Sequence, residues 1–388
     1  MSISNNAIVN FLKKFDEHPF MVKLSGEEHK IGDGEPVFTL SVKEDIPLSS
    51  LMSSTSIALG EAYMDGNIGI EGNLYQALNQ FLGQMGKFHT DTKALKKLIY
   101  SSLSKKNQKE EVTSHYDIGN DFYQLWLDET MSYSCGYFKT EEDTLLTAQK
   151  NKIERILQKL YLKPGMELLD IGCGWGELLI EAAKKYGVRG TGITLSQEQY
   201  EKFSKRIVDE GLSELLSVEI LDYRDLPKKE WLFDRVVSVG MIEHVGRDNY
   251  NLFLSCVGQV LKPQGMFLLH FISALKEYPG DAWIKKYIFP GGVIPSLREI
   301  INLTSEYNFY MLDIESLRRH YNRTLLCWER NFSKNREEIE KKMGARFTRM
   351  WHLYLCSCAA TFNNGIIDLH QILMTKGHNN ELPMTRWY

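Results

Sequence analysis

The nine residues 168–176, Leu-Leu-Asp-Ile-Gly-Cys-Gly-Trp-Gly, constrain the possible folds of this chain more than any other stretch. A short apolar run leads into a turn that contains Gly172, Gly174 and Gly176, and a helix-like segment at 177–186 follows at once. Continuous apolar runs of this length are typical of buried parallel strands, and a glycine turn lets the backbone approach a ligand that a Cβ would block. The stretch therefore predicts a buried strand, a turn and a helix beside a ligand.

Strand-like segments alternate with helical ones after this turn. The strands are expected at 190–195, 216–220, 234–239, 266–272, 309–315 and 366–374. Ser196 is placed to cap the helix after the second strand, with Gln199 three residues on. An aromatic excursion rich in Pro and Gly occupies 273–305, and charged helical segments lie at 322–362. This alternation predicts an α/β protein with a doubly wound sheet and right-handed crossovers.

Residues 1–95 have a different pattern and are expected to form a small α+β domain. Strands are predicted at 20–24 and 36–42, and helices at 56–63 and within 68–82, where apolar residues share one helical face. No cluster of titratable residues in this part suggests catalysis. A binding or docking module is the expected role.

A lysine-rich linker is predicted at 96–110, between this first domain and a second domain at 111–388. The lysines of this region are interleaved with Leu and Ile; they are Lys93, Lys96, Lys97, Lys105, Lys106 and Lys109. One interpretation is a solvated connector. The other is a basic amphipathic segment that binds the anionic headgroups of a membrane. Each cation near the surface then contributes about 1 kcal/mol to membrane binding.

Composition excludes several classes of protein. With 46 basic and 50 acidic side chains the net charge is −4, so a global basic field for nucleic acid is absent. The six cysteines form no CxxC pair, which argues against a zinc ribbon or a thioredoxin-like motif and favours reduced thiols in the cytoplasm. No apolar run reaches 18 residues, so any membrane contact is expected to be peripheral.

The glycine pattern at 172–176 is tighter than the G-x-G-x-x-G dinucleotide fingerprint and resembles the nucleotide-binding turn of class I methyltransferases. In open α/β sheets the ligand lies at the carboxyl ends of the strands. Thr194 and Leu195 end the second strand, where a nicotinamide-dependent oxidoreductase would carry an acid, which disfavours that alternative. After the third strand, Asp222 is placed to accept from an adenine amino group, and Tyr223 to stack on the ring.

Polar residues also follow the fourth and fifth strands. Glu243 and His244 stand in tandem in an apolar frame, and His270 lies within the apolar fifth strand. Buried polar groups of this kind are costly unless something pairs with them, so a site is expected here. A metal triad is disfavoured because the H-E-x-x-H spacing is absent and methyl transfer from a sulfonium needs no metal. A satisfied core histidine is the alternative for His270.

Seven motifs in one order then resemble the family of bacterial cyclopropane-fatty-acyl-phospholipid synthases. They lie at 114–123, 133–138, 170–176, 192–199, 241–246, 289–292 and 320–321. The similarity covers essentially the whole chain. The part at 111–388 also resembles mycolic acid methyltransferases, but the separate N-terminal domain fits the phospholipid enzymes better. The resemblance implies a class I methyltransferase fold with helical and aromatic substrate-binding insertions.

The resemblance implies that a methylene group passes from S-adenosylmethionine to a cis double bond in phospholipid acyl chains, with bound bicarbonate as the base. Carried over by motif, the bicarbonate site comprises Cys135, Glu243, His270, Ile272 and Tyr321, with Cys135 and Ile272 acting through their backbones. The residues implied for S-adenosylmethionine are Tyr133, Ser134, Gly172, Gly174, Thr194, Leu195, Gln199, Asp222, Tyr223 and Arg224.

The family also implies a homodimer whose N-terminal domains dock on lipid, and a cytoplasmic location at the inner face of the membrane. Two other functions compete with this one. A small-molecule N-methyltransferase would share the catalytic architecture, but the N-terminal domain and the lysine-rich linker argue against it. A non-catalytic lipid-binding protein is disfavoured by the intact glycine turn.

Overall fold

The computed structural model describes residues 3–84, 118–386 and 388. The chain divides into two compact units: Met1–Lys96, Asp281–Ile288 and Leu325–Ile366 form the first, and Lys97–Gly280, Phe289–Thr324 and Ile367–Tyr388 the second. Two later segments, Asp281–Ile288 and Leu325–Ile366, thus join the first unit, and the predicted boundaries at 95 and 111 lie outside the described residues. The predicted linker 96–110 and the basic stretch at 93–109 lie outside the described residues.

The second unit is built on a seven-stranded sheet in the order β10-β11-β9-β8-β5-β6-β7. Its strands are β5 (Glu167–Ile171), β6 (Arg189–Thr194), β7 (Leu216–Ile220), β8 (Phe233–Val239), β9 (Leu261–Ala274), β10 (Phe309–Ser316) and β11 (Ile367–Lys376). Strands β5 to β9 pair in parallel, whereas β11 is antiparallel to both β9 and β10. The predicted doubly wound α/β fold is confirmed, with an antiparallel pair added at one edge.

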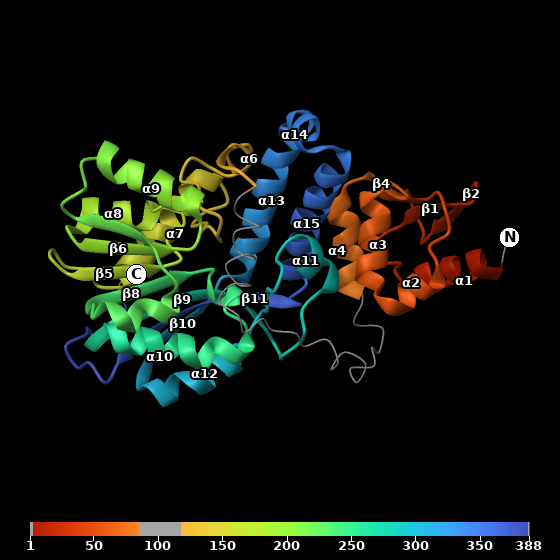
Figure 1. Ribbon diagram of the computed structural model, residues 1–388. Helices are drawn as coiled ribbons and strands as arrows, with labels where there is room; N and C mark the ends of the chain where they lie inside the picture. The colour runs from red at the N-terminus through yellow and green to blue at the C-terminus, as the bar shows by residue number, and fades with distance from the viewer. Residues whose placement is uncertain (1–2, 85–117, 387) are drawn as a thin grey trace. The chain divides into compact units, whose positions relative to one another are not determined.

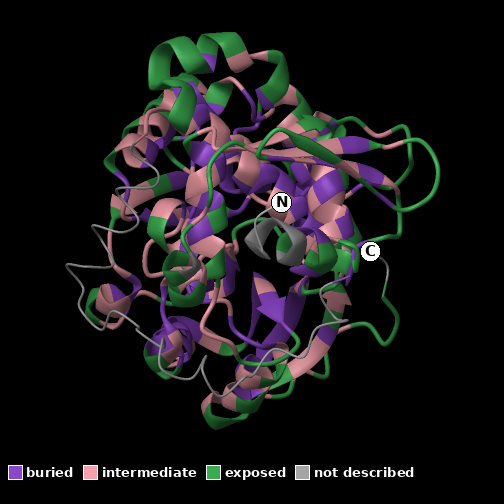
Figure 2. Cartoon of the chain, turned by 90° about the vertical axis from the view of Figure 1, so that its right-hand side faces the viewer, coloured by how far each residue is buried: buried purple, intermediate pink, exposed green. Residues whose placement is uncertain are grey.

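Helices cover both faces of this sheet (Figure 1). One face carries α7 (Leu145–Lys159), α8 (Glu177–Tyr186) and α9 (Gln197–Asp209), and the other carries α10 (Tyr250–Val260) and α12 (Leu297–Thr304). Each of these two helix layers packs on the sheet through its own cluster of buried apolar side chains. In Figure 2, where buried residues are purple, the strands in view are largely purple and the outer loops are green. Short elements complete the unit, namely α6 (Asn120–Gln124) and the 3-10 turns Tyr223–Lys229, Ile242–His244, Arg247–Asn249 and Ser305–Tyr307.

The glycine turn between β5 and α8 needs glycine for two different reasons. Gly172, Gly174 and Gly176 all have φ between 55° and 86°, a conformation that side chains with a Cβ rarely adopt. At Gly176 a Cβ would also lie 2.0 Å from Cδ2 of Phe203 on α9, whereas at Gly174 it would meet open space. The turn thus combines tight packing of α9 with an exposed stretch of backbone.

The first unit holds a four-stranded sheet in the order β2-β1-β3-β4. Its N-terminal elements are α1 (Ile3–Leu12), β1 (Phe20–Leu24), β2 (Glu27–Ile31), β3 (Phe38–Val42), α2 (Leu48–Ser53), α3 (Thr55–Met64), β4 (Ile68–Gly72) and α4 (Leu74–Gln84). The predicted helix at 68–82 is therefore wrong in its first turn, because Ile68–Gly72 pairs with β3. The expected small α+β domain is confirmed.

Later segments of the chain complete this first unit. They are α11 (Ala282–Tyr287), α14 (Arg336–Met343) and α15 (Ala345–Asn363), with the second half of α13 (Arg318–Lys334). Trp283 packs so closely on Gly60 that a Cβ there would lie 2.3 Å from its ring, and Arg349 donates to the carbonyls of Tyr63 and Ile68. In the described part of the chain, no helix is long and apolar enough to cross a membrane.

Replacing Gly176 by alanine is expected to destabilise the protein more than the same change at Gly211. Both residues have positive φ, but a Cβ at Gly211 meets open space, whereas at Gly176 it meets the Phe203 ring. Backbone strain alone costs about 1–3 kcal/mol, and forced repacking adds about 1–3 kcal/mol at Gly176. Urea unfolding of both variants measures the difference. Equal losses would contradict the packing role of Gly176.

Candidate active site

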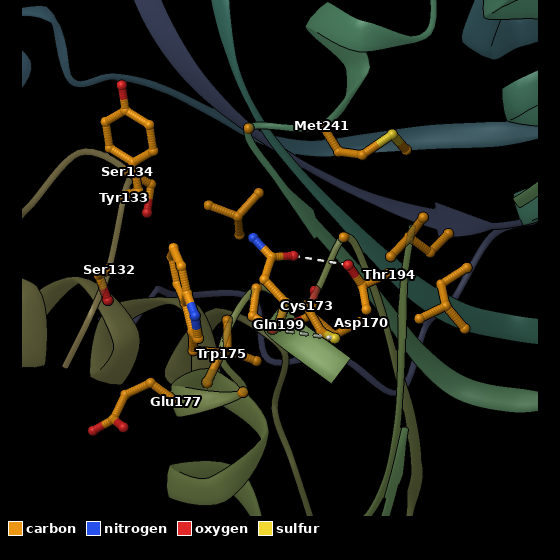
Figure 3. Close-up of a pocket in the computed structure, with 18 of the residues that line it drawn as sticks. Ser132, Tyr133, Ser134, Asp170, Cys173, Trp175, Glu177, Thr194, Gln199 and Met241 are labelled. Carbon is orange, nitrogen blue, oxygen red and sulfur yellow. Dashed lines mark hydrogen bonds between the residues drawn. The ribbon is translucent and has the colours of Figure 1, made fainter. Parts of the chain in front are cut away.

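A cavity opens at the carboxyl ends of β5, β6 and β8, beside the glycine turn (Figure 3). Nine of the ten residues predicted to hold a nucleotide line it: Tyr133, Ser134, Gly172, Gly174, Thr194, Leu195, Gln199, Asp222 and Tyr223. The edge of the sheet thus brings together residues that are up to 90 positions apart in the chain.

The end of β6 is fixed by a short network of hydrogen bonds. Oγ1 of Thr194 donates to Oε1 of Gln199 over 2.7 Å, and the Ser196 hydroxyl caps α9 by accepting from the Gln199 amide. The predicted cap at Ser196 is confirmed. Because Thr194 occupies the Gln199 oxygen, the Gln199 amide nitrogen is left to face the cavity, as the close-up shows.

Arg224 is the tenth predicted residue, and it does not line the cavity. Its guanidinium forms two hydrogen bonds with the Asp222 carboxylate, at 2.8 and 2.6 Å. The adjacent Tyr223 is buried against Phe253, with ring centroids 5.4 Å apart. Arg224 therefore orients Asp222 from behind the cavity wall.

The irregular segment 130–138 forms a second wall and is held by helix α7. The side-chain amide of Gln149 donates to the carbonyls of Ser132 and Ser134, and Nζ of Lys152 donates to the Ser134 hydroxyl over 3.0 Å. The segment contains no helix or strand. Its shape comes from α7, since polar side chains of that helix satisfy its carbonyl groups.

Aromatic side chains close the cavity near Trp175. Its indole nitrogen donates to Oδ1 of Asn120 over 2.7 Å, and Asn120 in turn donates to Glu198. The ring of Tyr123 lies 5.6 Å from both Trp175 and Tyr133. This contact joins α6 to the glycine turn, so a large apolar surface lies next to the polar sheet edge.

A second group of buried polar atoms lies behind this cavity, where β8 and β9 end. Oε1 of Glu243 accepts from the Ile272 amide over 2.7 Å, so these two residues are in contact. Oε2 of Glu243 and Nε2 of His270 are buried and have no hydrogen-bond partner among the described residues. Two buried polar atoms without partners at one sheet edge indicate a missing polar ligand.

The charge states of these two residues follow from their burial. Desolvation raises the pKa of Glu243 to about 7, so a neutral carboxyl is accessible near neutral pH. Desolvation lowers the pKa of His270 to about 3, which keeps its ring neutral. The Gln371 amide nitrogen lies 3.1 Å from Nδ1 of His270. With Nδ1 accepting from that amide, the ring proton is on Nε2, which is then a donor.

Cys135 and Tyr321 form another pair of predicted residues. Cys135 is fully buried, and burial raises the pKa of its thiol, so the sulfur is no thiolate. The next residue, Gly136, donates its amide to Thr324 over 3.0 Å, and Tyr321 lies one turn earlier on α13. The first turns of α13 therefore flank Cys135. None of the five residues implied for bicarbonate lines the cavity beside the glycine turn.

Glu243, His244 and His270 are not grouped as metal ligands. Among the described residues, only Glu329, His352 and Cys356 have ligand atoms close enough together to hold an ion. Of these, Nε2 of His352 lies 3.1 Å from Oε1 of Glu329, a hydrogen-bonding distance.

Sequence reasoning missed Lys152 as a cavity residue and did not single out Asp170 within its motif. Both line the cavity and are buried. A signal for Lys152 was present, because it shares a helical face with the buried Ala148 and Ile156. A lysine at such a position is costly unless a partner is nearby.

Comparison with known proteins identifies the family. The family described as mycolic acid cyclopropane synthetase matches residues 103–372, and a domain of unknown function matches residues 7–93. The cyclopropane-fatty-acyl-phospholipid synthase of Escherichia coli strain K12 is 38% identical in an alignment of 370 residues that covers 91% of this chain and 92% of that protein. The chain belongs to the mycolic acid cyclopropane synthetase family. The expected enzyme class, a methyltransferase that uses S-adenosylmethionine, is thereby confirmed.

Solved structures agree with this assignment. The cyclopropane synthase MmaA2 of Mycobacterium tuberculosis matches with a TM-score of 0.66 and 33% identity, over 69% of this chain and 98% of that one. The mycolic acid cyclopropane synthase CmaA1, complexed with SAH and CTAB, matches with a TM-score of 0.65 at the same identity and coverage. A coclaurine N-methyltransferase has a TM-score of 0.67 at 20% identity, over 83% of this chain and 100% of that one, and shows the fold alone.

Replacing Glu243 by glutamine is expected to stabilise the protein at pH 8 but not at pH 4.5. Because burial raises the pKa of Glu243 from 4.5 to about 7, the folded state binds more protons than the unfolded state between these values. The free energy of unfolding of the wild type therefore falls as pH rises through this window, by up to about 3 kcal/mol. The variant does not lose this stability, because glutamine does not titrate. Unfolding in urea at both pH values measures it. The exposed Glu306→Gln is the control, and a pH dependence shared by all three proteins would contradict the buried carboxyl.

Proposed function

We propose that this protein transfers a methylene group from S-adenosylmethionine to the cis double bond of unsaturated acyl chains in membrane phospholipids, forming cyclopropane fatty acids. The observation that carries the proposal is the pairing of an open glycine turn with two buried, unpartnered polar atoms at the neighbouring strand ends. The first suits a nucleotide-like donor, and the second suits a small polar ligand next to an apolar substrate.

The cavity residues would hold the donor. Gly174 offers backbone to a ligand without a Cβ in the way, and Gln199 presents its amide nitrogen. The Asp222 carboxylate is fixed by Arg224 and is placed to accept from an amino group of the base. CmaA1, whose structure is described as complexed with SAH, is 33% identical to this chain. Arg224 enters the proposal as a positioning residue for Asp222.

Bicarbonate fits the second group of polar atoms. His270 presents an N–H donor at Nε2, and Glu243 presents a carboxyl oxygen that is neutral or charged near pH 7. Tyr321 and the backbones of Cys135 and Ile272 complete the proposed set. Bicarbonate, when bound there, would supply a base that removes a proton from the transferred methyl group. Glu243 then orients the anion and takes no proton from substrate itself.

The reaction places strict demands on the chain. The sulfonium C–S bond breaks as the methyl carbon bonds to one alkene carbon, leaving a cation on the other. Loss of a methyl proton lets the same carbon bond to the second position and close the ring. Water would trap the cation as an alcohol, so water must be excluded. The buried Phe138 and the Tyr137 ring, stacked on His320 at 4.6 Å, provide apolar, electron-rich surface near Cys135.

Access to the acyl chain would come from the membrane surface. We include in the proposal that the protein works as a homodimer in the cytoplasm, peripherally bound to the inner face of the membrane. The lysines between 93 and 109 would lie on anionic headgroups, and two copies would add their contacts.

The proposal is tested with vesicles that contain oleoyl phospholipid, S-adenosylmethionine and the purified protein. The expected product is an acyl chain heavier by one CH2 and lacking the double bond. A chain that is unchanged, with donor binding retained in calorimetry, would contradict the proposal and favour a soluble acceptor such as an amine.

The bicarbonate site predicts a dependence of turnover on dissolved carbon dioxide. Rigorous removal of carbon dioxide should lower the rate, and added bicarbonate should restore it in the wild type. Glu243→Gln should lose most activity, by roughly 100-fold or more, because a group that positions the base is lost. Cys135→Ser should keep appreciable activity, since its proposed role is in the backbone. A Cys135→Ser enzyme as inactive as Glu243→Gln would refute this assignment.

Reversing the charge of Lys96, Lys97, Lys105 and Lys106 to glutamate should weaken sedimentation with anionic vesicles. Each lysine near the surface contributes about 1 kcal/mol to binding of anionic vesicles, so the four changes should weaken binding strongly. The difference from the wild type should diminish in high salt. Binding to neutral vesicles serves as the control. Unchanged sedimentation with anionic vesicles would assign these residues to a solvated connector.

A further inference from the structure

The charged groups around the cavity beside the glycine turn are not all paired. Two acidic residues there have partners: Asp222 pairs with Arg224, and Glu177 pairs with Arg206, each at 2.6 Å. His244 is half-buried, and desolvation lowers its pKa to about 4, so its ring is neutral. Two charged groups remain, Lys152 and Asp170.

Lys152 is the one lysine or arginine among the described residues that line this cavity. Its side chain is 4% exposed, and its Nζ donates to the Ser134 hydroxyl over 3.0 Å. It forms no ion pair within 4 Å with any described residue; Asp128, Asp170 and Glu177 act on it only through longer-range attraction. Desolvation lowers its pKa to about 8, which leaves it mostly charged at pH 7. A buried cation with only a hydroxyl for a partner is costly unless an anion joins it.

Asp170 lines the same cavity, and the close-up draws it together with Ser134. The residue is 3% exposed, and its Oδ1 has no hydrogen-bond partner among the described residues. Desolvation raises its pKa to about 7, against the attraction of Lys152. One cavity therefore presents a buried cation and a buried acid that attract each other at longer range, and neither forms an ion pair with a described residue. A zwitterion has the complementary charges.

We propose that Lys152, together with the Ser134 hydroxyl, binds the carboxylate at the amino-acid end of the methyl donor. The inference rests on the proposed function, since it needs S-adenosylmethionine or its product as the ligand. A lysine–carboxylate hydrogen bond in a water-poor cavity is strong. Two side chains of helix α7 thus contribute to the site. Gln149 holds the segment 130–138 through its carbonyl groups, and Lys152 would bind the donor carboxylate next to Ser134. Lys152 would thus be a donor-binding residue that contacts the carboxylate and not the transferred methyl group.

The test measures binding of three probes by calorimetry: S-adenosylhomocysteine, its methyl ester, and 5′-methylthioadenosine. The ester keeps the ammonium but neutralises the carboxylate, and 5′-methylthioadenosine lacks the amino-acid end. The wild type should bind the ester roughly 10- to 100-fold more weakly than the acid. Lys152→Met should lose a similar factor for the acid, lose little for the ester, and bind 5′-methylthioadenosine as the wild type does.

Lys150→Met is the matched control, because Lys150 is exposed on the same helix and its loss changes the net charge equally. It should keep the wild-type ratio of acid to ester affinity. Equal binding of acid and ester by the wild type would overturn the inference, as would an unchanged ratio in Lys152→Met. Should circular dichroism show that Lys152→Met is unfolded, Lys152→Gln replaces it, and the wild-type ratio remains decisive. Failure of the wild type to bind S-adenosylhomocysteine at all would overturn the proposed donor, a distinguishable outcome.

Discussion

Desolvation of polar side chains at the carboxyl edge of the sheet is the constraint on which the rest of the second unit depends. Asp170, Glu243 and His270 are each at least nine-tenths buried, and each keeps one polar atom without a partner among the described residues. Such groups destabilise a protein unless a ligand or a partner satisfies them. We interpret these unpartnered atoms as preorganisation, because a polar ligand would form hydrogen bonds with them.

A buried ionic network holds the helix that supports this edge. On α7, Arg155 and Lys159 both bond to Glu315 of β10, at 2.6 Å in each case, and Lys159 also lies 3.3 Å from Asp313. If α7 shifted, the charge of Lys159 would stay buried without its acidic partners, which is costly. The network therefore restricts where α7 can lie. This fixes Gln149 and Lys152 against the segment 130–138, two turns nearer the start of the helix. Distant ion pairs thus contribute to the geometry of the cavity without touching it.

The sequence predicted the parallel core well because β5 and β8 are short apolar runs that end before a glycine, and the other strands lie between recognisable helical segments. The helix at 177–186 and the cap at Ser196 agree with the structure, since local signals determine both. Ile68–Gly72 was misassigned because it was joined to the helical pattern that begins at Leu74, whereas Ile68 and Ile70 alternate as in a strand and the segment pairs with β3. Tertiary contacts of this kind are not encoded in local pattern.

The candidate site was predictable in part for the same reason. Residues next to strand ends, such as Thr194 and Asp222, meet because parallel strands end at one edge. Lys152 was missed because it lies on a helix, more than 15 residues before the glycine turn, and its side chain reaches the cavity only through packing of α7. Arg224 was placed in the site by its neighbours in sequence, although its guanidinium is engaged by Asp222.

The central claim is that a methyl group is transferred and then loses one proton as the ring closes. Donor labelled with deuterium at all three methyl positions tests it directly, using oleoyl phospholipid vesicles and mass spectrometry of the acyl chains. The account predicts a saturated product that contains a ring carbon with two deuterium atoms. A product that keeps all three would show methylation without ring closure and would contradict the account.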